Sequence, residues 1–293
     1  YNPPNQEDVE RWDVRIDHNL TTSDNVYVRY SSQHVFRPPS TNLPPPAYGS
    51  PDSAFENNGR NLAVVWSHIF SPSVVATTRA GWNKLSTEQH PPLDTNANVE
   101  LGLQGVDQTT PGAPRFVING VTALGVGPNL PNLNDSQTRQ VVSDLNWIRG
   151  SHTFKFGVNL SWLQAFITNP KEGLGVFNFN GNFTRNPVNN SGGAGFADFL
   201  LGIPFQTNAA NPVYSNLRSP FYHAYAQDEW RATRNLTLSI GLRYEYNGQW
   251  VETRNMLSNY DIDVTPAPVL VLAQEGDRAS RLRIFLQIVL PLT

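Results

Sequence analysis

Residues 235–246, NLTLSIGLRYEY, alternate between apolar and polar side chains without interruption. Neighbouring side chains of a β-strand point to opposite faces of the sheet. The stretch therefore predicts a strand with one apolar and one polar face. The apolar positions are Leu236, Leu238, Ile240, Leu242, Tyr244 and Tyr246, and the polar positions are Thr237, Ser239, Gly241, Arg243 and Glu245.

The same alternation recurs along the chain, most clearly in HTFKFGVNLSW (152–162) and RWDVRID (11–17). Together these stretches predict about eight strands, most of them roughly 9–13 residues long. Strands of soluble proteins average about 5–6 residues, whereas a strand that crosses a membrane needs about 9–11. Strand length thus favours a membrane-spanning sheet. Weaker alternation occupies residues 25–34, 59–70, 74–84, 138–149 and 220–230.

The connections between these strands alternate between short and long. Hairpins with short turns are expected at about residues 9–34, 59–84, 138–166 and 219–249. Structureless connections as long as those between the hairpins are uncommon in a compact soluble domain, but outer-membrane barrels have short periplasmic turns and long outer loops. The long connections, rich in Pro, Gly and Asn, cover roughly residues 35–58, 85–137 and 167–218.

Charged and aromatic residues also follow a membrane pattern. An Arg that faces lipid at mid-bilayer costs about 2–4 kcal/mol. In the clearest strands the charged residues occupy the polar positions and not the apolar ones. Aromatic side chains fall near strand ends, as in interfacial girdles. We therefore predict an all-β fold, an antiparallel transmembrane β-barrel in the outer membrane of a Gram-negative cell, of which the chain supplies about 8–10 strands. The charges are Arg11, Arg15, Lys155, Arg243 and Glu245; the aromatics are Trp12, Trp66, Trp82, Trp147, Trp162, Tyr244, Tyr246 and Trp250.

Composition argues against several other classes. The chain has 293 residues, a formal net charge of −3, 15% charged residues and no Cys. The lack of Cys excludes disulfide scaffolds, Cys-based zinc sites and thiol catalysis. Because the net charge is near zero and Lys occurs only at positions 84, 155 and 171, we expect neither a phosphate-binding surface nor a nucleic-acid partner. No stretch approaches the roughly 18 apolar residues of a membrane helix.

The hairpin FYHAYAQDEWRATRNLTLSIGLRYEY (221–246) resembles a segment of the TonB-dependent outer-membrane receptors, and within them the Oar-like group. Further segments resemble the same barrel, and together they cover most of residues 9–272. They are FADFLLGIP (196–204), WIRGSHTFKFG (147–157), FSPSVVATTRAGWN (70–83) and NVYVRYS (25–31).

The resemblance implies a 22-stranded barrel that holds an N-terminal plug and takes up a ligand across the outer membrane, driven through a TonB energy-transducing complex. Outer-membrane lipid, the plug and that complex are then the expected partners. We find no plug, no N-terminal signal and no coupling motif, so residues 1–273 are expected to be part of a larger barrel. Residues 274–293 lack the terminal aromatic residue typical of such barrels, and form either an extra strand or an atypical tail.

No motif for catalysis or cofactor binding appears, so we expect neither an enzyme nor a cofactor nor a metal site. Asp228 and Glu229 are neighbours on a predicted strand, so they point to opposite faces and do not form a catalytic pair. The sequence DID at 261–263 lacks the spacing of a calcium loop. The scattered histidines are expected at strand ends or in the lumen, and are His18, His34, His68, His90, His152 and His223.

Two further groups have a structural and a functional interpretation. The alternating charges Arg11, Asp13, Arg15 and Asp17 form either a self-satisfied ladder in the lumen, which we favour, or a contact with the plug. Aromatic residues in VFNFNGNF (176–183) either pack within a folded loop, which we favour, or stack on a sugar or ferric chelate; they are Phe177, Phe179 and Phe183.

Two alternatives to receptor-mediated uptake stay open at this point. One is a small self-closed barrel that acts as a pore or adhesin. The other is a soluble all-β glycan-binding domain. The ligand-binding residues are not identified by the sequence.

Overall fold

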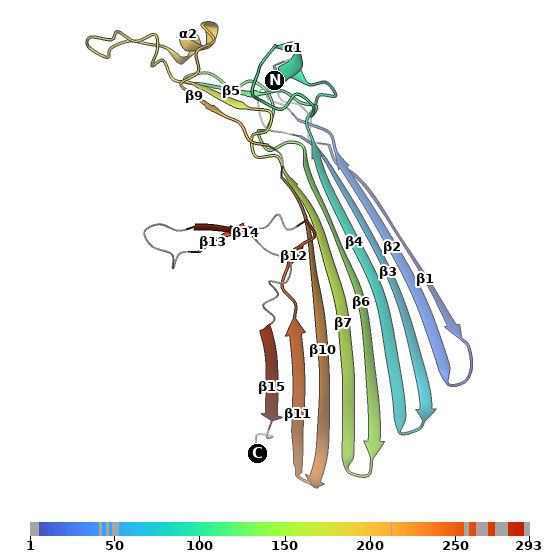
Figure 1. Cartoon of the computed structure of the whole chain (residues 1–293). Coiled ribbons are helices and arrows are strands. Elements are labelled where there is room, and N and C mark those ends of the chain that lie inside the picture. Colours follow the sequence, from blue (N-terminus) through green and yellow to red (C-terminus); the bar gives the residue numbers. More distant parts are fainter. Residues whose placement is uncertain are drawn as a thin grey trace.

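The computed structural model describes residues 6–40, 43–44, 47–48, 53–211, 213–254, 258–261, 269–272 and 281–289. Its main element is a ten-stranded antiparallel sheet, here called the wall (Figure 1). The strands lie side by side in chain order, except that β12 pairs with β10. They are β1 (Asp8–Asn19), β2 (Asp24–Arg37), β3 (Ala54–Ser71), β4 (Val74–His90), β6 (Asn132–Arg149), β7 (His152–Asn169), β10 (Val213–Thr233), β11 (Leu236–Asn247), β12 (Val251–Glu252) and β15 (Arg281–Val289).

The hairpins β1–β2, β3–β4, β6–β7 and β10–β11 overlap the four ranges expected from the sequence, and their short turns all lie at the lower end of the wall in Figure 1. In the turn between β6 and β7, Gly150 has a φ of 61°, a left-handed conformation that glycine adopts at no steric cost. The long connections meet at the opposite, upper end. The expected all-β antiparallel fold with alternating short and long connections is therefore confirmed.

The paired strands of the four hairpins are 12 to 21 residues long, which corrects the expected 9–13. The additional residues lie at the upper end, where β3 and β4 are polar on both faces. Asn57 and Asn58 of β3, for example, pair with Thr87 and Ser86 of β4. A strand without an apolar face shows no alternation in the sequence, so the upper ends of β3 and β4 are not predicted; in β7 the apolar residues Ala165, Phe166 and Ile167 are consecutive and do not alternate either.

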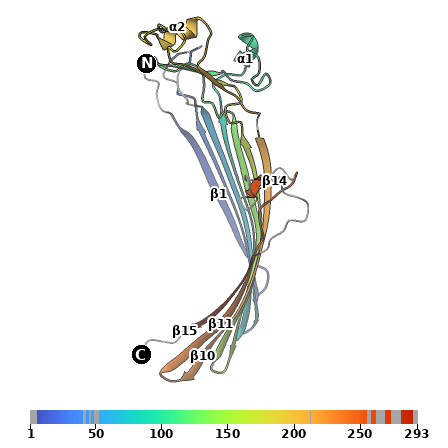
Figure 2. The same ribbon diagram turned by 60° about the vertical axis from the view of Figure 1, so that its left-hand side comes forward.

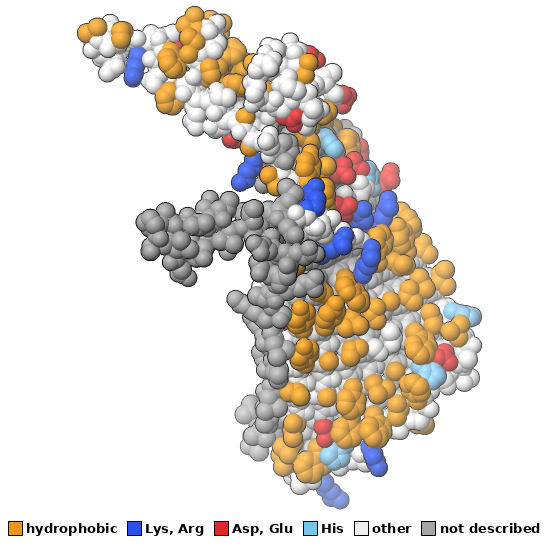
Figure 3. Space-filling model, in the orientation of Figure 1, with side chains coloured by type: hydrophobic (Ala, Val, Ile, Leu, Met, Phe, Trp, Pro, Cys, Tyr) orange, Lys and Arg blue, Asp and Glu red, His pale blue; other side chains and the backbone are white. Residues whose placement is uncertain are grey.

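The two faces of the wall differ in polarity. On the outer face, Val74, Ala76, Thr78, Ala80 and Trp82 of β4 precede Lys84, and equivalent runs on the neighbouring strands make an apolar band (Figure 3). Those roughly ten residues span about 33 Å along the strand, or about 25 Å along the barrel axis at a tilt near 40°. An apolar band about 25 Å tall is the height expected of an outer-membrane barrel.

The long connections 91–131 and 170–211 fold together at the upper end into a unit here called the cap (Figure 2). They were expected to be structureless, but they contain two short helices and a three-stranded sheet in the order β5-β8-β9. Leu174 and Val126 are each only 1% exposed and pack with Ala113 in the core of the cap. The elements are α1 (Ala97–Glu100), β5 (Arg115–Ile118), β8 (Val176–Phe179), α2 (Gly195–Leu200) and β9 (Gln206–Asn208).

The region after β12 contributes a two-stranded sheet, β13 (Ser258–Asp261) with β14 (Val269–Leu272), and strand β15. β15 lies within the expected tail and pairs with β11. In the described part of the chain, β1 pairs only with β2 and β15 only with β11, so the wall is an open sheet. Within the same described residues, no helix is both long enough and apolar enough to cross a membrane.

Candidate functional site

The inner face of the wall is polar, because the polar residues that alternate with the apolar ones in each strand point to this face. Arg243 of β11, Lys155 of β7 and Asp13 of β1 lie on this face, opposite the apolar outer positions. All five charges that the sequence assigned to the polar parity lie on it, as expected. The inner face and the hollows against it are therefore the candidate site for a polar solute.

Charges on the inner face pair mostly with one another. Arg29 of β2 donates to Asp13 of β1 at 2.8 Å, and Arg15 pairs with Asp17 at 2.7 Å. The guanidinium of Arg15 also lies 4.0 Å from the centre of the Tyr27 ring. The self-satisfied ladder that the sequence suggested is thus present for Asp13, Arg15 and Asp17. Further along the face, Arg243 pairs with Glu245 at 2.6 Å and Lys155 with Glu229 at 3.7 Å.

A second network joins three strands around a glycine. Asp144 of β6 accepts a hydrogen bond from Tyr225 of β10 at 3.0 Å and pairs with Arg79 of β4. The Tyr225 ring crosses Gly157 of β7, where an added Cβ would lie 2.1 Å from Cε1 of that ring. The missing side chain at position 157 therefore makes room for the ring that bridges the network.

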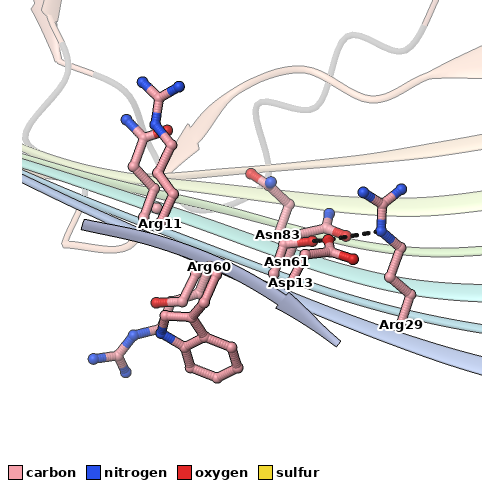
Figure 4. Close-up of a pocket in the computed structure, with 11 residues that line it drawn as sticks. Arg11, Asp13, Arg29, Arg60, Asn61 and Asn83 are labelled. Carbon is pink, nitrogen blue, oxygen red and sulfur yellow. Dashed lines mark hydrogen bonds and ion pairs between the residues drawn. The ribbon is translucent and has the colours of Figure 1, made fainter. Parts of the chain in front are cut away.

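A shallow, open hollow lies on β1–β4 and has a volume of about 510 Å³ (Figure 4). Arg11, Asp13, Arg29, Asn61 and Asn83 lie on the inner side of the sheet in this view, whereas Arg60 points to the other side. The hollow offers cationic and amide donors together with amide acceptors. Such a lining suits a polar, hydrogen-bonding solute.

A second hollow, of about 640 Å³, lies beside the cap. Val106, Asp107 and Thr110 of the cap line one side of it, and Tyr214 of β10 lines the other. Burial acts to raise the pKa of the Asp107 carboxyl. Hydrogen bonds donated by Thr110 and Thr109 outweigh burial and hold that pKa below its usual value of 3.8. Asp107 is therefore a fixed anion that orders this edge of the cap.

Asparagine side chains hold the cap together. Asn98 is fully buried and donates to the carbonyl oxygens of Asp107 and Leu174, at 2.8 and 3.0 Å. Asn96 caps α1 by accepting from the backbone N–H groups of Asn98 and Val99. Buried polar groups must find partners, so these amides fix the otherwise irregular backbone of the connection.

The aromatic residues of 176–183 divide into two groups. Phe177 stacks on Phe116 with ring centres 5.5 Å apart, and Phe179 packs edge-on against Phe199 at 5.3 Å. Phe183 is instead exposed to solvent. The favoured interpretation, packing within a folded loop, therefore holds for Phe177 and Phe179 and not for Phe183.

The other candidates are not brought together. Asp228 lies on the outer face and bonds to His152 at 2.7 Å, whereas Glu229 lies on the inner face. The Nδ1 atom of His68 bonds to Asp24 at 2.6 Å near the lower end. Of the sequence DID, Ile262 and Asp263 lie outside the described residues. Among the described residues, no three His, Cys, Asp or Glu side chains cluster as a metal site would require.

Sequence reasoning missed the Arg79–Asp144–Tyr225 network and the buried amides of the cap. Both depend on residues far apart in the chain, such as Asp144 and Tyr225. The one local signal was a glycine in a strand, Gly157, because an interior glycine often marks the close approach of another group.

Comparison with known proteins gives one family. The family described as outer membrane beta barrel domain matches residues 1–284. No curated protein matches the chain. Three solved structures illustrate the structural likeness, each at low identity. The outer membrane transporter YddB from Escherichia coli is 11% identical with a TM-score of 0.48, and the alignment covers 82% of this chain and 27% of that one.

The copper transporter OprC is 10% identical, with a TM-score of 0.47 and coverage of 97% of this chain and 34% of that one. The ferric preacinetobactin receptor BauA from Acinetobacter baumannii is 11% identical, with a TM-score of 0.48 and coverage of 97% and 37%. The chain therefore spans between 27% and 37% of the length of these three structures.

Proposed function

The chain belongs to the outer membrane beta barrel domain family, and on this premise we propose that it forms part of the barrel of a TonB-dependent receptor-like protein that takes up a ligand. The family places the protein in the outer membrane, which sets aside the soluble glycan-binding alternative. The resemblance of residues 221–246 to TonB-dependent receptors supports the more specific assignment.

The observation that carries the proposal is the wide, polar inner face of an open ten-stranded sheet. In lipid, unpaired strand edges leave backbone groups without partners, at several kcal/mol each. The proposal therefore includes further strands that close the barrel. A barrel wider than about eight strands has an interior that its own side chains do not fill, so a plug is the expected content of the lumen.

In this proposal the protein has no catalytic step. Ligand binds to polar groups of the inner face and the cap, and energy from a TonB complex drives its passage past the plug. The hollow with Asn61 and Asn83 offers amide donors and acceptors in adjacent strands, which suits a neutral or zwitterionic polar solute.

The test compares cells that have or lack the gene, grown in a complex medium whose components are followed by mass spectrometry. We expect at least one polar compound to be depleted only when the gene is present. Its depletion should stop when a protonophore removes the energy supply. An Asn61→Trp variant, which fills the hollow, should slow depletion, whereas Thr237→Ala, at the lower end of β11, should not.

Passive pore activity is the outcome that would contradict the proposal. It would appear as depletion that persists with the protonophore, together with steady ion conductance of the purified protein in planar bilayers. A plugged receptor should show little conductance.

A further inference from the structure

Cations gather on the outer face directly above the apolar band. Lys and Arg side chains cross the wall at this level in Figure 3, between the band and the cap. By strand register, Arg60 of β3 pairs with Lys84 of β4, and Arg139 of β6 lies beside Trp82 of β4. Arg218 of β10 pairs with Gln164 of β7, which itself pairs with Gln137 of β6. The register thus aligns four cations along one level of the membrane boundary.

Three of these cations have no anionic partner in the described part of the chain. Lys84 pairs with Asp135 at 2.8 Å. Arg60, Arg139 and Arg218 are exposed, and no carboxylate of the described residues lies within ion-pairing distance of them. On the inner face, in contrast, most Arg side chains are paired within the wall. Unpaired guanidinium groups at this level therefore face outward with their donors available.

A hollow of about 660 Å³ lies between Arg139 and Arg218, across β7. Its lower side is aromatic: Trp162 contacts Tyr222 edge-on with ring centres 6.3 Å apart, and Tyr222 stacks on Tyr246 at 5.7 Å. Gln164 lies in the hollow, but its amide is occupied, since it accepts from Gln137 at 2.8 Å and donates to Asn216 at 3.2 Å. The charged donors of the hollow are the two arginines.

We propose that the hollow between Arg139 and Arg218 binds the phosphate groups of a membrane lipid in the leaflet next to the cap. Guanidinium groups bind phosphate through paired, charge-assisted hydrogen bonds. The aromatic side below them lies at the level of acyl chains and headgroup linkers, where Trp and Tyr are favoured. Arg60 extends the same cationic level toward β1. The proposal rests on the outer-membrane location and not on ligand uptake.

Composition argued against a phosphate-binding surface, because the net charge of the whole chain is −3. That number averages over two faces and the cap. The sum carries no information on position: acidic residues of the outer face such as Asp24 and Asp228 lie near its lower end, away from Arg139 and Arg218. A local cationic surface is therefore compatible with a nearly neutral chain.

The experiment uses the protein isolated from its own outer membrane in detergent, with bisphosphorylated and monophosphorylated lipid A as probes. The test variant is Arg139→Gln/Arg218→Gln. The matched control, Arg149→Gln/Arg234→Gln, removes the same charge from exposed positions at the lower end of the wall. Heat-modifiable gel mobility checks that each variant is folded.

Each cation near an anionic lipid surface changes affinity by about fivefold, so the test variant should bind bisphosphorylated lipid A about 25-fold more weakly, and the control as the original protein does. The original protein should also prefer the bisphosphorylated to the monophosphorylated form.

Equal binding by test and original protein would overturn the proposal, as would an equal loss in the control. Competition by inorganic phosphate at the same concentration as the lipid would overturn it too, because the site would then recognise free phosphate. Ligand uptake is measured separately, so its failure leaves this result interpretable.

Discussion

The wall and the cap place their apolar side chains in opposite directions. In the wall, Trp12 and Ile16 of β1 are 53% and 65% exposed on the outer face. In the cap, Leu174 and Val126 are almost completely buried. The difference follows from the solvent: lipid surrounds the wall, so apolar groups are stable outside, whereas water surrounds the cap, so they are stable inside. One chain thus follows two folding rules, and the boundary between them lies at the cationic level of the outer face.

The two regions also satisfy their backbone groups differently. The wall does so by continuous strand ladders between neighbours in the sequence. The cap has few ladder bonds and depends on side chains such as Asn96 and Asn98. Changes in the wall should therefore affect the whole protein, and changes in the cap should remain local.

The largest effect is expected for a charge on the outer face of the wall. Leu242→Arg places a guanidinium in the apolar band and should cost about 2–4 kcal/mol, because the charge leaves water. The fraction of folded protein in the outer membrane, measured by heat-modifiable mobility, should fall strongly. Ser239→Arg on the inner face of the same strand is the control and should fold normally; equal loss in both variants would remove the distinction between the faces.

The second effect should break the cap and leave the wall intact. Gly125 has a φ of 87°, and an added Cβ would lie 1.8 Å from the carbonyl oxygen of Pro114. Gly120→Ala is the matched control, because Gly120 has a φ of 84° and nothing lies within 4 Å of an added Cβ. Gly125→Ala should therefore cost about 1–3 kcal/mol more than the control.

Trypsin reports this difference at Arg115 in β5 of the cap. Cleavage should be faster in Gly125→Ala than in Gly120→Ala, while the wall keeps its heat-modifiable mobility. Loss of that mobility in Gly125→Ala would mean that the cap is not a separate local unit.

The third effect tests packing on the inner face. Gly157→Ala pushes the ring of Tyr225 away and weakens its hydrogen bond to Asp144. The ring is the mobile end of a side chain, so the cost should be about 1 kcal/mol. Gly81→Ala is the control, since its added Cβ would be 3.9 Å from the nearest atom. The midpoint of urea unfolding should be lower for Gly157→Ala than for Gly81→Ala. Equal midpoints would mean that the Tyr225 network has no role in stability.

The smallest effect concerns Asp107 in the cap and depends on pH. Its pKa is lowered in the folded protein, so its contribution is present above the unfolded value of 3.8 and is lost as pH falls through the folded value. Asp107→Asn should reduce stability locally by at most about 1 kcal/mol after allowance for solvent screening. Amide exchange of residues 103–112 should differ between variant and original protein at pH 7 and converge near pH 2; a difference that is the same at both would contradict the assignment.

The sequence predicted the wall and not the cap, for a physical reason. Alternation in 235–246 and 152–162 identifies strands, because the polarity of each side chain indicates whether it points to the lipid-facing or the polar face of the sheet. The order of the hairpins follows from their short turns. The upper strand ends, near Asn57 and Ser86, are polar on both faces and carry no such signal. In the cap, packing joins Phe116 to Phe199 and Gly125 to Pro114, and no local pattern encodes such pairs.

Part of the candidate site could be predicted from the sequence. The polar parity of Arg11, Asp13 and Arg15 follows from alternation alone, so the inner face was expected. The cationic level of the outer face was not, because Arg139 and Arg218 lie in different hairpins. Only strand register aligns them.

The most direct test of the central claim is a cysteine scan of residues 237–242 in intact outer membranes, which is simplified by the absence of Cys from residues 1–293. Each single Cys carries a fluorophore, and quenching by a lipid-soluble quencher is compared with quenching by a water-soluble one. We predict strong lipid quenching at Leu238, Ile240 and Leu242, and aqueous quenching at Thr237, Ser239 and Gly241. Uniform quenching along the stretch, or the opposite parity, would contradict it.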